Sequence, residues 1–261
     1  MTLIVLASAS GAPGVTTTAV GLARCWPGDT LLVDADRQPS QSVQAGFLNG
    51  APTGGHGLTG LARIHRERRF LADEIPRHCV PLGPEPEHRR LFLPGFAHPG
   101  SAGLFVPIWP DLTQGLERFR ASGFTVIVDA GRIGDGLPGP LLAAADVVLV
   151  VTRTHLRALA GVRLHLPVVT DRLAALATGT ELGLLLIGEG QPYSGAEISR
   201  QFGLAVWGTL PERPKHAAVW SDGAPSPARF DRSPLVQGIR ATIATLRTGN
   251  TPSADRQEVT R

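Results

Sequence analysis

The chain has 261 residues, a formal charge of +3, 43% hydrophobic and 18% charged residues. This length is typical of one large α/β domain, and the composition is typical of a globular protein. Two cysteines, Cys25 and Cys79, are too few for a disulfide scaffold, so we expect a cytoplasmic protein. No apolar stretch reaches the ~18 residues of a membrane span. The nearly neutral charge does not favour nucleic acid as a partner.

Short apolar runs alternate with segments of helical spacing along the chain. Continuous apolar runs predict buried strands at residues 3–7, 31–33, 124–128, 147–151, 182–187 and 204–207. Helical spacing predicts helices at residues 17–23, 112–121, 157–177, 196–202 and 235–247. This alternation predicts an α/β domain with a doubly wound, mostly parallel sheet flanked by helices.

Residues 46–110 differ from the rest of the chain because they are rich in Gly, Pro, Arg and His. They predict an irregular insertion within a single domain of residues 1–247, with one helix at 58–69 and one strand at 90–93. Loops on a rigid scaffold often carry partner contacts, so a partner-binding role and a purely structural one both remain open. The polar residues 248–261 predict a disordered tail.

A glycine-rich loop, Ser-Ala-Ser-Gly-Ala-Pro-Gly-Val-Thr-Thr-Thr at residues 8–18, follows the first apolar run. A strand, a glycine turn and a helix start together bind phosphates, because the N–H groups of the turn point inward and the helix dipole is positive there. The loop lacks the Gly-x-Gly-x-x-Gly spacing of dinucleotide-binding turns, so a nicotinamide or flavin site is not favoured. The expected nucleotide-binding residues are Gly11, Gly14, Val15, Thr16 and Thr17.

Three aspartates stand at predicted strand ends: Asp34 and Asp36 after the second run, and Asp129 after the third. The carboxyl ends of parallel strands meet at the ligand crevice. We expect Thr16, Asp34 and Asp129 to hold Mg²⁺, and Asp36 to be the catalytic residue if any activity is retained. Strand-end aspartates also cap helices, so a purely structural role remains open.

These motifs, in this order, resemble the deviant-Walker ATPases of the ParA/MinD type. Residues 10–17 match the family's Lys-Gly-Gly-x-Gly-Lys-Thr-Thr, residues 33–38 match its apolar-Asp-x-Asp-x-Gln, and the strand ending at Asp129 matches its third motif. The resemblance implies a MinD-like P-loop fold, Mg-ATP or ADP as cofactor and a homodimer. It also implies a protein partner in a polar, envelope or division assembly, through which the chain is peripheral at the membrane. Residues 91–95 and the long middle segment are similar to the TadZ/CpaE branch.

Two departures from the family signature remove both of its lysines: Ser10 and Val15 stand in their places. Phosphoryl transfer depends on electrostatic stabilisation. We therefore expect a pseudo-ATPase with no nucleotide or only weak Mg-ATP/ADP, acting as a non-hydrolysing positioning or scaffold factor. One alternative is a slow Mg-ATPase in which Arg37, Arg132 or Arg153 replaces the lost charge. Another is a DNA-associated, partition-like protein.

Overall fold

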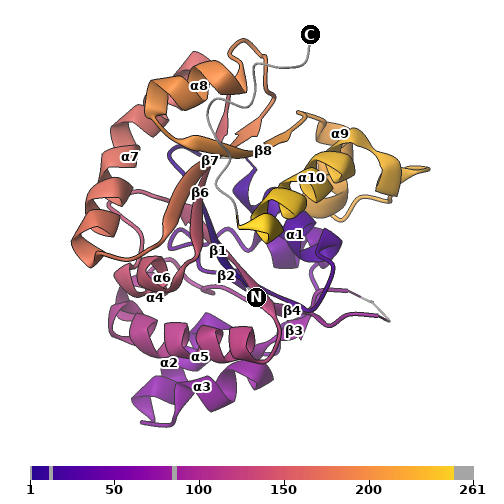
Figure 1. The fold of residues 1–261 in the computed structure, drawn as a ribbon. Helices are drawn as coiled ribbons and strands as arrows, with labels where there is room; N and C mark the ends of the chain where they lie inside the picture. The colour runs from indigo at the N-terminus through magenta and orange to yellow at the C-terminus, as the bar shows by residue number, and fades with distance from the viewer. Residues whose placement is uncertain (1, 12–13, 84–86, 250–261) are drawn as a thin grey trace.

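In the part of the chain that the computed structural model describes, residues 2–11, 14–83 and 87–249, eight strands form one sheet (Figure 1). The strands lie in the order β3-β4-β2-β5-β1-β6-β7-β8. Neighbouring strands are parallel except for β3 and β4 at one edge, which are antiparallel. Their bounds are β1 Leu3–Ser8, β2 Thr30–Asp34, β3 Val80–Pro81, β4 Arg90–Leu93, β5 Thr125–Arg132, β6 Val147–Arg153, β7 Glu181–Ile187 and β8 Ala205–Leu210.

Helices cover both faces of this sheet (Figure 1). The helices packed on one face are α1 (Val15–Cys25), α9 (Pro214–Ser221) and α10 (Pro234–Thr248). Those on the other face are α2 (Leu58–Arg66), α3 (Leu71–Glu74), α4 (Ser101–Leu104), α5 (Trp109–Ala121), α6 (Gly139–Ala144), α7 (Leu156–Leu176) and α8 (Gly195–Phe202). The predicted single α/β domain with a doubly wound, mostly parallel sheet is confirmed. No helix among the described residues is long and apolar enough to cross a membrane.

The central part of each long strand is apolar because both faces of the sheet are buried. In β1, Leu3 and Val5 pack into the core beneath α5 and α7, whereas Ile4 and Leu6 pack into the core beneath α1 and α10. All four side chains are fully buried. This two-sided burial explains why continuous apolar runs, rather than alternating ones, predicted the strands.

The third predicted strand is longer in the structure than in the sequence pattern. The pattern ends it at residue 128, but β5 continues to Arg132, because Ser8 of β1 pairs with Arg132. Between the pairs Leu6–Asp129 and Ser8–Arg132, three steps along β5 match two along β1. The extra residue is a β-bulge, and Gly131 at its centre has a left-handed backbone with φ 64°. The bulge adds one residue to β5, so that Arg132, and not Gly131, pairs with Ser8.

Residues 46–110 contribute to the sheet and the core as well as to loops. The predicted strand at 90–93 is β4, which lies between β3 and β2. The side chains of Phe92, Phe96 and Phe105 are fully buried. The predicted helix at 58–69 is α2, which ends at Arg66 because the chain turns left-handed at Arg68, with φ 56°. The four-residue helices α3 and α4 are too short for a periodic pattern to show, and so is the two-residue strand β3.

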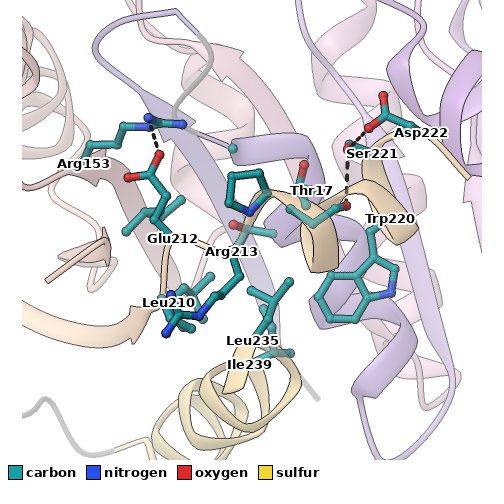
Figure 2. A pocket seen from close by; sticks show the side chains of 16 residues that line it. Thr17, Arg153, Leu210, Glu212, Arg213, Trp220, Ser221, Asp222, Leu235 and Ile239 are labelled. Atoms are coloured by element: carbon teal, nitrogen blue, oxygen red, sulfur yellow. Dashed lines mark hydrogen bonds and ion pairs between the residues drawn. The ribbon is translucent and has the colours of Figure 1, made fainter. Parts of the chain in front are cut away.

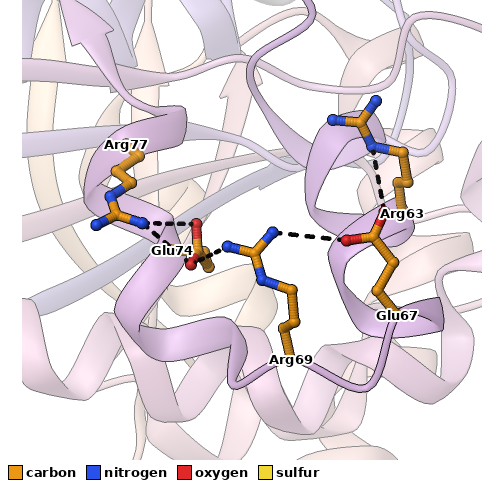
Figure 3. A network of polar contacts seen from close by, with 5 residues as sticks. All are labelled: Arg63, Glu67, Arg69, Glu74 and Arg77. Carbon is orange, nitrogen blue, oxygen red and sulfur yellow. Dashed lines mark hydrogen bonds and ion pairs between the residues drawn. The ribbon is translucent and has the colours of Figure 1, made fainter.

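An ion-pair network lies on the surface where α2 and α3 meet (Figure 3). Arg69 lies between Glu67 and Glu74 and pairs with both carboxylates. Arg63 pairs with Glu67, and Arg77 pairs with Glu74. Exposed pairs of this kind each contribute about 0–1 kcal/mol. The apolar core therefore supplies most of the stability of this segment.

The remaining predicted elements follow the sequence pattern closely. The closing helix predicted at 235–247 is α10, and the helix predicted at 157–177 is α7. Most of the predicted tail at 248–261 lies outside the described residues. Both cysteines are free thiols, and burial raises the pKa of Cys25 to about 11 and that of Cys79 to about 12. Neither thiol is therefore a nucleophile at neutral pH.

Candidate phosphate-loop site

The glycine loop connects the end of β1 to the start of α1, as predicted. Gly14 precedes the helix with a left-handed backbone, φ 104° and ψ 28°, a conformation that strongly favours glycine. Its carbonyl accepts a hydrogen bond of 2.9 Å from the Thr18 amide. No side chain caps α1. The amides at the start of a helix, here those of Val15, Thr16 and Thr17, lack partners within the helix. This arrangement suits an anion.

Val15, which stands where the loop lysine is expected, is a core residue. Its side chain is only 6% exposed and packs in the apolar core with Ala19 of the same helix. Ser10, at the other lysine position, has its Cβ 3.5 Å from the point that a Cβ on Gly161 of α7 would occupy. Neither side chain can supply positive charge to the loop.

The buried aspartates behind the loop lie side by side. Asp34 and Asp129 are paired residues on β2 and β5, exposed by 8% and 3%. Burial, together with the neighbouring Asp129, raises the pKa of Asp34 to about 8. Burial also raises the pKa of Asp129 to about 6, opposed by hydrogen bonds from the Thr16 side chain and the Gly131 amide. A cation near Thr16 and Asp129 would relieve the cost of ionising these groups.

The expected Mg²⁺ ligands are brought together only in part. The Thr16 side chain acts on the Asp129 carboxyl and lowers its pKa, whereas Asp34 lies against Gly95, where an added Cβ would come within 2.6 Å of the Asp34 Cγ. Asp34 also accepts a hydrogen bond of 3.2 Å from the Asp36 amide. In the ranges that the structure describes, no group of three or more His, Cys, Asp or Glu side chains could hold a metal ion. Thr16 and Asp129 suit Mg²⁺ that keeps several waters or phosphate oxygens.

A cavity of about 390 Å³ opens in front of the loop. Its wall includes residues 14–17 from the start of α1, Asp36 and Gln38 from the segment after β2, Arg132 from β5, and Asp222 from the residue after α9. Burial raises the pKa of Asp36, opposed by the Gln38 amide and the charges of Arg132 and Arg37. All five predicted nucleotide-binding residues except Gly11 therefore line one cavity.

A second cavity of about 300 Å³ also borders Gly14 and Thr17 (Figure 2). At one end, Arg153 of β6 pairs with Glu212 after β8, with 2.6 Å between Nη1 and Oε1. At the other end, Trp220 lies beside the polar residues Ser221 and Asp222. Both cavities border Gly14 and Thr17, so the start of α1 faces space in which a ligand could be bound.

The structure separates the three arginines that the sequence offered as replacements for lysine. Arg37 pairs with Asp135 at 2.8 Å and donates to the carbonyl of Ile133 at 3.2 Å. Arg153 is held by Glu212 beside the second cavity. Arg132 lies directly against Gly11 of the glycine loop: its Nη2 is 3.0 Å from the point that a Cβ on Gly11 would occupy.

Two residues of the site had not been assigned a role in it from the sequence. Gly131 lets Asp36 approach β5, since a Cβ there would lie 2.1 Å from the Asp36 Cγ. In the sequence, the position of this glycine two residues after Asp129 could have indicated a role in the site. Asp222 lines both cavities. It lies far from the loop in sequence, and only the packing of α9 beside α1 brings it there.

Comparison with solved structures places this architecture among known proteins. The MinC:MinD cell division protein complex from Aquifex aeolicus matches with a TM-score of 0.71 and 15% identity, covering 97% of this chain and 98% of that one. A ParA family ATPase from Chlorobium tepidum matches with a TM-score of 0.70 and 15% identity, over 94% and 98% of the two chains. The septum site-determining protein MinD from Pyrococcus horikoshii, complexed with Mg-ADP, matches with a TM-score of 0.66 and 13% identity, over 94% and 95%.

No family model matches the sequence, and no curated protein matches it. The similarity is therefore one of architecture, and identities this low establish the fold alone. The strand order, the glycine loop between β1 and α1, and the aspartates at the ends of β2 and β5 agree with that assignment. The structural neighbours of this chain are MinD and ParA ATPases, and the chain has their fold.

Proposed function

We propose that this chain is a MinD/ParA-like positioning or scaffold factor that does not hydrolyse ATP. The observation that carries the proposal is the burial of Val15, 6% exposed, at the position of the loop lysine. Ser10 removes the second lysine, and Lys215, the single lysine of the sequence, is exposed on α9. Removing one charged or hydrogen-bonding group that stabilises a transition state typically lowers a rate by about 10²–10³. The loss of both lysines leaves negligible turnover.

The proposed role and partners follow the named neighbours. One neighbour is a complex of MinD with MinC, a cell division protein complex, and another is a ParA family ATPase. We infer a cytoplasmic homodimer that binds a protein of a polar, envelope or division assembly and is peripheral at the membrane through it. The MinD that was solved with Mg-ADP supports Mg-ADP or Mg-ATP as a weakly bound ligand of the same loop here.

Steady-state phosphate release tests the absence of hydrolysis. The purified full chain is assayed with millimolar Mg-ATP beside Asp36→Asn, which removes the expected catalytic carboxylate. We expect both proteins to release phosphate at the rate of buffer alone. A wild-type rate above that background, lost in Asp36→Asn, would show that the chain is an ATPase. A trace rate shared by both proteins would identify a contaminating enzyme.

Localisation in the native cell tests the positioning role. A fluorescent fusion of the full chain is expected to gather at a pole, at midcell or in foci, and Asp36→Asn is expected to give the same pattern, because the role does not depend on turnover. A uniform distribution of both fusions would contradict positioning. Binding to duplex DNA that weakens steeply with salt would favour the partition-like alternative instead.

A further inference from the structure

A phosphate-binding loop without lysine needs positive charge from another part of the chain if it is to hold a polyphosphate. Neither Val15 nor Ser10 supplies it, and Lys215 is not among the residues that line the two cavities beside the loop. We propose that Arg132, at the end of β5, is the phosphate-binding cation of this site. It would bind the polyphosphate of a Mg-nucleoside diphosphate or triphosphate in the cavity of about 390 Å³.

The pairing of β5 with β1 determines where the side chain of Arg132 lies. Arg132 pairs with Ser8, the last residue of β1, and the next amide, that of Ile133, donates to the Ser8 carbonyl at 2.9 Å. The one-residue bulge at Gly131 moves the side chain of Arg132 onto the loop side of the sheet edge. Its guanidinium consequently lies against Gly11, with Nη2 3.0 Å from the position of an added Cβ. Arg132 therefore belongs to a strand of the central sheet, and its side chain extends from that strand to the loop.

Arg132 is also the candidate that can exchange its partner without breaking an ion pair in the structure. Its Nη1 donates to the neutral Oε1 of Gln38 at 2.9 Å, and the residue is exposed. Arg37 and Arg153, by contrast, are each bound to a carboxylate. Replacing an amide oxygen by phosphate oxygens strengthens the interaction, because a guanidinium binds phosphate through two parallel charged hydrogen bonds.

The negative charges around the cavity make the binding of a polyphosphate depend on a divalent cation. Asp36 and Asp222 line it together with Arg132, and Asp129 lies behind Thr16. Without a divalent cation, these carboxylates outnumber the single guanidinium and repel a polyphosphate. Mg²⁺ bound next to Thr16 and Asp129 would offset this excess of negative charge. The proposal therefore requires binding of the nucleotide to depend on both Arg132 and Mg²⁺.

Calorimetric titration with Mg-ADP and Mg-ATP tests this inference, which rests on the proposed weak nucleotide ligand of the same loop. Arg132→Ala is compared with wild type and with Arg157→Ala, which removes the same charge from an exposed position on α7. We expect Arg132→Ala to weaken binding by about tenfold to a hundredfold, the range for hydrogen bonds to charged groups. Arg157→Ala should leave binding unchanged, Arg132→Lys should retain part of it, and EDTA should abolish it.

Two results would overturn the inference: equal affinity in wild type and Arg132→Ala, or no binding by wild type at millimolar nucleotide. If Arg132→Ala does not fold, judged by its thermal unfolding, Arg132→Gln keeps a shorter, uncharged polar side chain and gives the same test. The outcome is separate from that of the phosphate-release assay. Turnover by wild type would refute the non-hydrolysing role and leave Arg132 as the cation, whereas absent binding would refute Arg132 and leave a scaffold without nucleotide.

Discussion

Asp34 and Asp129 stand opposite each other on neighbouring parallel strands, both buried, and the Ala35 amide donates to the Asp129 carbonyl at 2.8 Å. Two carboxyl groups in this arrangement cannot both ionise cheaply without a cation. The pair therefore has consequences for stability as well as for metal binding. The same feature that suits the site to Mg²⁺ destabilises the metal-free protein at neutral and alkaline pH.

Stability should fall with rising pH because of Asp34. Its pKa is raised from 3.8 in the unfolded chain to about 8 in the folded protein, so the folded state binds more protons between these values. The stabilising contribution is complete below about pH 4 and is lost as pH rises toward 8. Asp34→Asn removes this titration. We expect its free energy of unfolding in urea, relative to wild type, to increase by more than about 1 kcal/mol from pH 5 to pH 8, since one pKa unit corresponds to ~1.4 kcal/mol.

Comparing the two proteins at each pH cancels the contributions of titrating groups far from Asp34, and the measured difference reports on Asp34 together with Asp129, whose charge acts on it. Metal-free buffer with EDTA is used throughout. A difference between variant and wild type that does not change from pH 5 to pH 8 would contradict the raised pKa of Asp34.

Val15→Lys should destabilise the fold and fail to restore turnover. The side chain at this position is 6% exposed in an apolar core, so an ammonium must be desolvated or the helix start must shift. We expect the free energy of unfolding to fall by about 1–3 kcal/mol. Val15→Met, uncharged and of similar length, is the matched control for steric effects. If Val15→Lys is as stable as Val15→Met, the position accepts a charge and the burial argument is wrong.

Gly131→Ala should be more destabilising than Gly134→Ala, a change with the same backbone strain. Both glycines are left-handed, with φ 64° and 56°, which costs alanine roughly 1 kcal/mol. A Cβ at Gly131 would also lie 2.1 Å from the Asp36 Cγ, whereas the nearest atom at Gly134 is 3.6 Å away on Arg37. We expect Gly134→Ala to lower the free energy of unfolding by about 1 kcal/mol and Gly131→Ala by more. Equal losses in urea unfolding would show that Asp36 moves aside freely.

Gln38→Ala should affect nucleotide affinity in the opposite direction to Arg132→Ala. Gln38 accepts the 2.9 Å hydrogen bond that Arg132 must give up to bind phosphate. Removing this competitor should tighten Mg-ADP binding by a few-fold, since a net hydrogen bond contributes about 0.5–1.5 kcal/mol. Calorimetric titration of both variants checks the sign. A Gln38→Ala protein that binds as weakly as Arg132→Ala would show that Gln38 supports the site instead.

The sequence by itself determined most of the sheet and the form of the loop. Strands buried on both faces are mainly apolar, so β1, β4 and β6 could be placed from local composition. Gly14 before a helix start predicted the phosphate-binding turn, because only the local backbone shapes such a turn. The lack of lysine at positions 10 and 15 was also evident from the sequence. Short elements such as α3, α4 and β3 gave no periodic signal.

Only the tertiary structure decided which arginine lies against the loop and that the side chain of Val15 is buried in the apolar core. Arg37, Arg132 and Arg153 all stand at or just after the carboxyl ends of strands, and nothing local to them distinguishes one from another. The pairing of Ser8 with Arg132, across more than a hundred residues of sequence, and the bulge at Gly131 direct one guanidinium to Gly11. These contacts depend on the register between distant strands, which local residue patterns do not encode.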